Sequence, residues 1–155
     1  MCGKIEDTKY GDEKFDVVTM TDLIEHILSP KSFLKEVNRV LKKNGVLLLT
    51  TPNFDSFTRR LLGKDWFQYK YEHIIYYNKK SIFYLLEKEG FKVLTTRNNV
   101  KRCKIEYYYY YFKQYSFCGI EKIIATVFPY LPMFIKNFSF PNPITGEMIV
   151  IAQKM

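Results

Sequence analysis

The chain has 155 residues, of which 47% are hydrophobic and 26% are charged. This length is typical of one domain, and the apolar content is enough for a packed core, so a wholly disordered chain is excluded. The three cysteines are scattered and form neither a disulfide framework nor a Cys-x-x-Cys metal motif. The amino terminus carries no apolar signal-peptide core. We therefore expect a protein of a reducing, cytoplasmic compartment.

The charge is distributed unevenly along the chain. The formal net charge is +8, yet residues 1–30 hold seven acidic and three basic side chains, which leaves a net +12 for the rest. A basic surface of this kind could bind nucleic acid or anionic lipid. No basic run reaches five residues, and the chain carries no recognisable nucleic-acid-binding module. We therefore predict no nucleic-acid site.

The first predicted elements are a strand and a helix. Residues 15–20 form a short apolar run, which is typical of a buried parallel strand. Ser29 is a suitable helix cap, Pro30 suits the first helical position, and apolar residues then recur at helical spacing.

The helix is expected to end just before a second strand. Lys42 and Lys43 suit its last turn, where the helix dipole favours cations, and Asn44-Gly45 supplies a left-handed stop. Residues 46–51 are apolar on both faces and predict the next strand. This order of strand, helix and strand predicts a right-handed crossover and a parallel sheet.

The remaining elements are a helix and two strands. Asn78 is a suitable cap for a helix that Gly90 ends, residues 91–96 are strand-like, and so are residues 148–152. The domain prediction is one domain over residues 1–155, with a hydrophobic lid or insertion at about 100–140.

The segment between the last two strands is the least regular part. Residues 107–112 are six aromatics in a row, which indicate a half-buried strand or helix face more than a ligand site. The longest uncharged run, residues 123–135, is shorter than the roughly 20 residues of a membrane span, and prolines interrupt it. Core or lid packing is the favoured interpretation, and a Lys-flanked aromatic helix lying on a membrane is the alternative.

Ligands of open α/β sheets bind beyond the carboxyl ends of the strands. Three segments are expected to meet there, namely residues 21–26, 51–53 and 72–77.

The sequence of these segments resembles a known family. Residues 15–53, FDVVTMTDLIEHILSPKSFLKEVNRVLKKNGVLLLTTPN, closely resemble the middle of class I S-adenosylmethionine-dependent methyltransferases. Residues 56–93, SFTRRLLGKDWFQYKYEHIIYYNKKSIFYLLEKEGFKV, are similar to a subgroup that includes small-molecule and glycan methyltransferases. The resemblance runs from Gly3 to Val93, with a looser echo at residues 147–154.

The resemblance implies a partial Rossmann-like α/β fold that lacks its first strands. The chain has no Gly-x-Gly turn for close approach to the cofactor, and Lys4 stands where the family usually has an aspartate that accepts the adenine amino group. The expected sheet is mixed and mostly parallel, with family strand order 4-5-7-6 and the seventh strand antiparallel. We expect an amino-terminally truncated domain whose strand at residues 15–20 is an uncovered edge.

The resemblance also implies which residues form the site. It places S-adenosylmethionine against Ile5, Met20 and Thr21. It assigns the methyl acceptor to four further residues, Glu25, Asn53, Trp66 and Tyr77. Trp66 lies in a loop between two helices and is expected to be a lid or a hydrophobic plug. Binding of the cofactor by this chain alone is left open.

The two histidines are the candidate catalytic bases, His73 before His26, because a base is needed only when the acceptor must lose a proton. Each histidine follows a glutamate, so Glu25, His26, Glu72 and His73 could form a metal site. Family resemblance alone accounts for both pairs, so no metal is predicted, and structural hydrogen bonding is the alternative role for both histidines.

The predicted function is S-adenosylmethionine-dependent methyl transfer to a small-molecule, lipid or glycan acceptor. The alternative is a non-catalytic methyltransferase remnant that binds another protein through its edge strand. The expected partners are a second copy of the chain or a separately encoded amino-terminal half.

Overall fold

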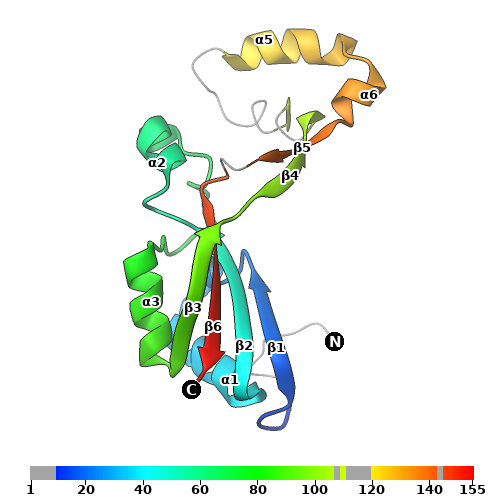
Figure 1. Cartoon of the computed structure of the whole chain (residues 1–155). Helices are drawn as coiled ribbons and strands as arrows, with labels where there is room; N and C mark the ends of the chain where they lie inside the picture. Colours follow the sequence, from blue (N-terminus) through cyan, green and yellow to red (C-terminus); the bar gives the residue numbers. More distant parts are fainter. Residues whose placement is uncertain (1–9, 107–108, 111–119, 143–144) are drawn as a thin grey trace. The chain divides into compact units, whose positions relative to one another are not determined.

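The computed structural model describes residues 10–106, 109–110, 120–142 and 145–155. The chain divides into two compact units (Figure 1). Unit 1 comprises residues 1–99 and 146–155, and unit 2 comprises residues 100–145. Each unit has its own β-sheet.

Unit 1 is built on a four-stranded sheet with the order β1-β2-β6-β3. β1 (Phe15–Thr21) is parallel to β2 (Leu41–Pro52), whereas β6 (Glu147–Lys154) is antiparallel to both β2 and β3 (Phe91–Asn98). Three strands therefore point one way, although two of the three ladders are antiparallel. The α/β class, the order 4-5-7-6 and the antiparallel seventh strand are confirmed.

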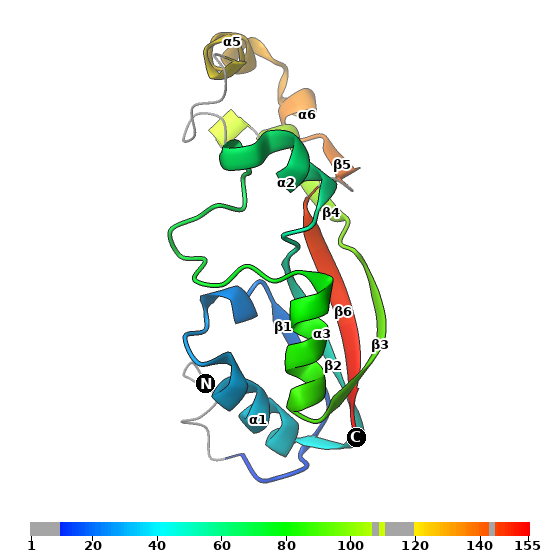
Figure 2. The same cartoon turned by 90° about the vertical axis from the view of Figure 1, so that its left-hand side faces the viewer.

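Two helices, α1 (Pro30–Val40) and α3 (Lys79–Lys88), cover the same face of this sheet (Figure 2). The covered face is apolar, because the side chains of paired residues alternate between faces and the inward set is Leu, Val, Met, Phe and Ala. The core cluster includes Met20, Leu34, Val37, Leu47, Leu49, Ile82, Leu86, Phe91, Met148, Val150 and Ala152.

The sequence placed the junction between α1 and β2 too late. α1 ends at Val40, and Lys42 and Lys43 belong to β2, not to a last helical turn. The left-handed residue is Asn44, with φ 63°, and a Cβ on Gly45 would lie 2.8 Å from the Lys42 carbonyl oxygen. The close approach of the strand backbone, not a helix stop, therefore requires the glycine.

The two predicted caps have different outcomes. The Asn78 side chain accepts a hydrogen bond from the Ser81 amide, and the Ser81 hydroxyl accepts one from the Asn78 amide, so α3 begins with a capping box. Ser29 precedes α1, but its side chain makes no capping hydrogen bond. Pro30 lacks an amide hydrogen, which removes one of the donors that a cap would satisfy.

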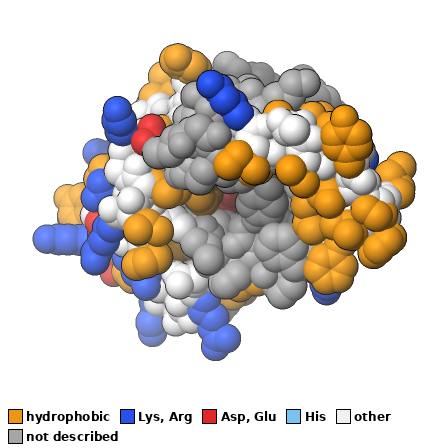
Figure 3. Space-filling view, turned by 90° about the horizontal axis from the view of Figure 1, so that it is seen from above, with side chains coloured by type: hydrophobic (Ala, Val, Ile, Leu, Met, Phe, Trp, Pro, Cys, Tyr) orange, Lys and Arg blue, Asp and Glu red, His pale blue; other side chains and the backbone are white. Residues whose placement is uncertain are grey.

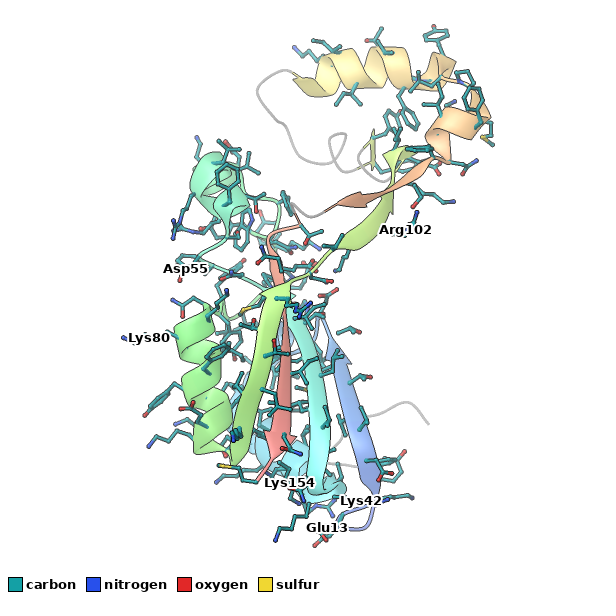
Figure 4. The ribbon with its side chains drawn as sticks, in the orientation of Figure 1. Glu13, Lys42, Asp55, Lys80, Arg102 and Lys154 are labelled. Atoms are coloured by element: carbon teal, nitrogen blue, oxygen red, sulfur yellow. The ribbon has the colours of Figure 1, made fainter. Side chains whose placement is uncertain are left out.

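The two ends of the sheet differ in character. Lys42, Glu13 and Lys154 lie at one end, where Lys154 Nζ is 3.6 Å from Glu13 Oε1 and donates to the Leu41 carbonyl at 2.8 Å (Figure 4). Asp55 lies beyond the opposite end, between β2 and α2 (Phe57–Leu62) (Figure 4). That opposite end, at the carboxyl ends of β1 and β2, carries the candidate site.

Unit 2 contains an antiparallel pair, β4 (Lys101–Lys104) and β5 (Ser139–Asn142), that the sequence did not predict. Between them lie α5 (Ile120–Val127), the 3-10 turn η4 (Phe128–Tyr130) and α6 (Met133–Lys136). Several apolar side chains of this unit are exposed, and hydrophobic side chains gather on the surface seen in Figure 3. Most of the aromatic run at 107–112 lies outside the described residues.

The helices that the structure describes include none with the length and apolar character needed to cross a membrane. The lid and the membrane-surface interpretations of residues 100–140 both stay predictions.

Candidate functional site

The chain turns sharply where β1 ends. Asp22 has a left-handed φ of 50°, an uncommon conformation for a residue with a side chain. Its amide donates to both the carbonyl and the hydroxyl oxygen of Thr50, and the Thr50 hydroxyl donates to the Asp22 carboxylate at 3.0 Å. These bonds hold the strained turn and direct the chain into the 3-10 helix η2 (Ile24–His26).

Glu25 is a fully buried carboxylate within η2. Its Oε2 accepts a hydrogen bond of 3.0 Å from the Thr51 hydroxyl at the end of β2, while its Oε1 is buried without a partner among the described residues. Burial raises the pKa of Glu25, and its hydrogen bonds oppose that rise only in part. An unpaired buried carboxylate oxygen is costly, so this atom indicates a ligand.

The backbone of Glu25 fixes the third segment of the site. Its carbonyl oxygen accepts from the amides of Ile74 and Ile75, at 2.9 and 3.1 Å. These two bonds tie the segment 72–77 to η2, although the two segments are almost 50 residues apart in sequence. The tie brings His73 next to His26.

The two histidine rings lie edge to face, with centroids 4.9 Å apart. His26 Nδ1 is 2.7 Å from the carbonyl oxygen of Glu72, and His73 Nδ1 is 2.8 Å from that of Gln68. A carbonyl oxygen only accepts hydrogen bonds, so each Nδ1 carries a proton, and in the neutral form of either ring the lone pair is on Nε2. Burial lowers the pKa of His73, which favours this neutral form at pH 7.

Tyr77 lies beside this cluster. Its side chain is buried, and its hydroxyl has no hydrogen-bond partner in the described part of the chain. Burial, with a smaller contribution from the Glu25 charge, raises the pKa of Tyr77 to about 12, so the phenol is a hydrogen-bond donor at neutral pH.

Asn53 and Trp66 are placed where they support the loops. Asn53 Oδ1 accepts from the Asp55 amide at 3.0 Å, as in a turn stabilised by an asparagine side chain, and its backbone bridges to Tyr77. Trp66 is 1% exposed and contacts the rings of Phe54 and Tyr69 at their edges. A plug fits this burial, and binding of a substrate by either residue stays a prediction.

The structure describes two of the three predicted cofactor residues, and their side chains lie on opposite faces of the sheet. Met20 is buried on the helix-covered face of the sheet, and Thr21 is exposed on the other face. Ile5 lies outside the described residues. Their contact with a cofactor therefore stays a prediction.

The sequence reasoning missed three residues that support the site, namely Thr51, Gln68 and Glu147. The Thr51 hydroxyl donates to Glu25. The Gln68 carbonyl oxygen accepts from His73, and the Gln68 side-chain amide donates to Glu147 at 2.8 Å. A threonine at the end of an apolar strand was a signal for the first residue. Gln68 and Glu147 are 79 positions apart in an irregular loop and a distant strand, and no local pattern links them.

Three side chains of the described residues could hold a metal ion, namely Glu25, His26 and His73. One ligand atom from each lies within 4.8 Å of the others. The side chain of Glu72, which the sequence paired with His73, is not part of this group.

The sheet has one antiparallel strand beside the parallel pair, and polar groups lie at the carboxyl ends of β1 and β2. Together these features define a Rossmann-like protein of the class I methyltransferase type. The sequence profile of a methyltransferase domain family matches residues 4–96, which is more than half of the chain. The chain belongs to this methyltransferase domain family.

Two relatives illustrate the sequence similarity. An uncharacterised protein of Methanocaldococcus jannaschii is 31% identical over 97 residues, which are 59% of this chain and 45% of that protein. A ubiquinone biosynthesis O-methyltransferase of Histophilus somni is 38% identical over 56 residues, which are 35% of this chain and 24% of that enzyme. The chain thus matches less than half the length of either relative.

Solved structures show the same fold. A Bacillus halodurans protein assigned as a methyltransferase superimposes with a TM-score of 0.61 at 22% identity, covering 98% of this chain and 75% of that one. A SAM-dependent methyltransferase of Archaeoglobus fulgidus gives 0.58 at 17% identity, covering 99% and 66%.

Proposed function

We propose that this chain contributes the acceptor-binding side of an S-adenosylmethionine-dependent methyltransferase that acts on a small-molecule, lipid or glycan acceptor. The convergence of Glu25, His26, His73 and Tyr77 at the carboxyl ends of β1 and β2 carries this proposal. Family membership and the similarity to an O-methyltransferase support a hydroxyl acceptor.

The cluster provides groups that methyl transfer to oxygen needs. The acceptor oxygen attacks the methyl carbon, the carbon–sulfur bond breaks, and the sulfonium becomes a neutral thioether. The hydroxyl proton must leave, and the Nε2 lone pair of His73 or His26 accepts it. Much of the rate comes from holding the acceptor in line with the methyl group, which a buried and fixed cluster favours.

The 155-residue chain is tested for both binding and transfer. In calorimetric titration with S-adenosylmethionine, a dissociation constant below about 100 μM, equivalent to roughly −5.5 kcal/mol, would favour an active cofactor site within this chain. Labelled methyl donor with a panel of phenolic, lipid and glycan hydroxyl acceptors then measures transfer.

A matched pair of variants distinguishes the site from the loop that carries it. His73→Ala should keep donor binding and lose transfer, whereas Tyr71→Ala, a fully exposed neighbour in the same loop, should keep both. A chain that binds no S-adenosylmethionine and transfers no methyl group contradicts enzymatic activity of this chain by itself. It would favour the non-catalytic interaction module, for which the specific observation is that β1 pairs with β2 alone among the described strands.

A further inference from the structure

The group of Glu25, His26 and His73, in which Glu25 and His73 are buried and His26 is half-buried, has the composition of a metal centre. A carboxylate and two imidazoles offer one ligand atom each, all within 4.8 Å of one another. Nitrogen ligands from histidine with one carboxylate oxygen are a frequent set for Zn²⁺ and other divalent first-row metals. The side chains come from two segments that the backbone bonds of Glu25 hold together.

Each of the three side chains is also oriented by a second contact. Thr51 donates to Glu25 Oε2, and carbonyl oxygens hold Nδ1 of both histidines. Metal-binding histidines almost always donate their other ring nitrogen in this way, which fixes the tautomer with a lone pair on Nε2.

The carboxylate supplies an independent observation. Glu25 is fully buried, and its Oε1 has no hydrogen-bond partner within the described part of the chain. Its second oxygen is satisfied by Thr51, so one oxygen remains for a cation. A bound cation would remove the cost of leaving a carboxylate oxygen unpaired in the interior.

The distances are compatible with one ion after a small movement. With metal–ligand bonds of about 2.1 Å, two ligand atoms of the same ion lie no more than about 4.2 Å apart. The observed span of 4.8 Å is within about 1 Å of this limit, which rotation of the histidine side chains can supply.

We propose that Glu25, His26 and His73 form a binding site for one divalent first-row transition-metal ion, with open positions for oxygen ligands. Sequence alone favoured no metal, because family resemblance accounted for both Glu-His pairs, and it could not show that three of the four side chains converge. A metal here would act as a Lewis acid on an oxygen ligand and so favour loss of its proton. With the metal bound, the Nε2 atoms of His26 and His73 would be ligands, so they would no longer serve as the proton acceptors of the proposed methyl transfer. The proposal does not rest on the proposed function, because binding is measured without methyl donor.

Cobalt(II) is the probe, because its visible absorption reports the ligands and their number. The metal-stripped 155-residue chain is titrated with Co²⁺, and Zn²⁺ is then added as a competitor. One equivalent of Co²⁺ should bind and be displaced by Zn²⁺. No binding at millimolar Co²⁺ overturns the proposal, and so does a cobalt–thiolate charge-transfer band, which would place the ion on cysteine.

Variants locate the ion. His26→Ala, His73→Ala and Glu25→Gln should each weaken Co²⁺ binding at least about 100-fold, and Thr51→Val, which removes only the support for Glu25, should weaken it by about 10-fold to 100-fold. Glu72→Gln is the matched control, since it removes an exposed carboxylate and keeps the carbonyl that holds His26; its affinity should not change. The proposal is overturned if His26→Ala and His73→Ala bind Co²⁺ as tightly as the unaltered chain does.

If a variant fails to fold, the site can still be tested by a measurement on the unaltered chain. His26 and His73 are the only two histidines of the sequence. Their imidazole proton resonances should both shift on addition of one equivalent of Zn²⁺ and stop shifting beyond it. Resonances that do not move, or only one that moves, contradict the site.

Discussion

The two faces of the sheet in unit 1 carry similar residues and have different surroundings. On the face that α1 and α3 cover, Leu47, Leu49 and Val150 are fully buried. On the other face, Val46, Leu48, Ile149 and Ile151 are only half-buried, and Val17 of β1 is 55% exposed. Strands that are apolar on both faces are typical of sheets covered on both sides. In the described part of the chain, α1 and α3 cover one face of the sheet, and no helix covers the other.

The uncovered face and the edge at β1 are consistent with a chain that matches only part of its relatives. We propose that a second polypeptide, either another copy or a separately encoded partner, covers them. Exposed edges and apolar patches promote pairing.

Removing a side chain from the covered face should have the largest effect. Leu49→Ala is expected to lower the free energy of unfolding by about 2–5 kcal/mol, because it leaves a cavity between β2 and the helices. Leu48→Ala, one residue along on the open face, should cost less than half as much. Urea titration of both variants measures the difference, and equal losses would show that the open face is covered after all.

Charge on the open face should weaken self-association. Size-exclusion chromatography with light scattering is expected to show a dimer of the 155-residue chain at high concentration. Val17→Lys should raise its dissociation constant about tenfold, or about 1.4 kcal/mol, because a charge would be buried at the contact. Leu28→Lys, at a position 81% exposed and outside the sheet, is the control. A stable monomer at all concentrations contradicts this prediction.

The helix cover depends on the capping box at the start of α3. Asn78→Ala should cost about 1 kcal/mol, because the Ser81 amide loses its acceptor. Ser81→Ala removes the reciprocal bond. Thermal unfolding of the double variant should show a loss smaller than the sum of the two single losses, since the bonds belong to one motif. Strict additivity would argue against that coupling.

The smallest effect is expected at the exposed edge strand. The hydrogen bond and the charge of Lys42 hold the pKa of Asp16 below its usual value of 3.8. A lowered pKa in the folded state contributes stability above the unfolded value, and this contribution is lost as the pH falls below 3.8 through the folded pKa. Asp16→Asn should therefore be slightly less stable than the unaltered chain at pH 7, and the difference should shrink as the pH falls below 3.8. High salt should remove the difference, because the pair is exposed.

Local patterns predicted the elements of unit 1 well. The apolar runs at 15–20 and 148–152 and the helical spacing after Pro30 correspond to β1, β6 and α1. The boundary at residues 40–45 was wrong, because α1 ends at Val40 and the next residue, Leu41, already pairs with Phe15 of β1. The short sheet of unit 2 was missed, since its strands of four residues are too short to show an alternating pattern.

For the candidate site, too, the sequence predicted one part and the tertiary structure decided the other. The sequence placed Glu25, His26 and His73 at strand ends, because the carboxyl edge of a parallel sheet follows from the order of strands. It predicted that the segments carrying them meet, but it could not show which of their side chains converge. The tertiary structure decided this, through two hydrogen bonds that the amides of residues 74 and 75 donate to the Glu25 carbonyl, which close a loop of almost 50 residues. Periodicity and capping act between neighbours in the chain, whereas the meeting of distant loops depends on backbone groups that every residue shares.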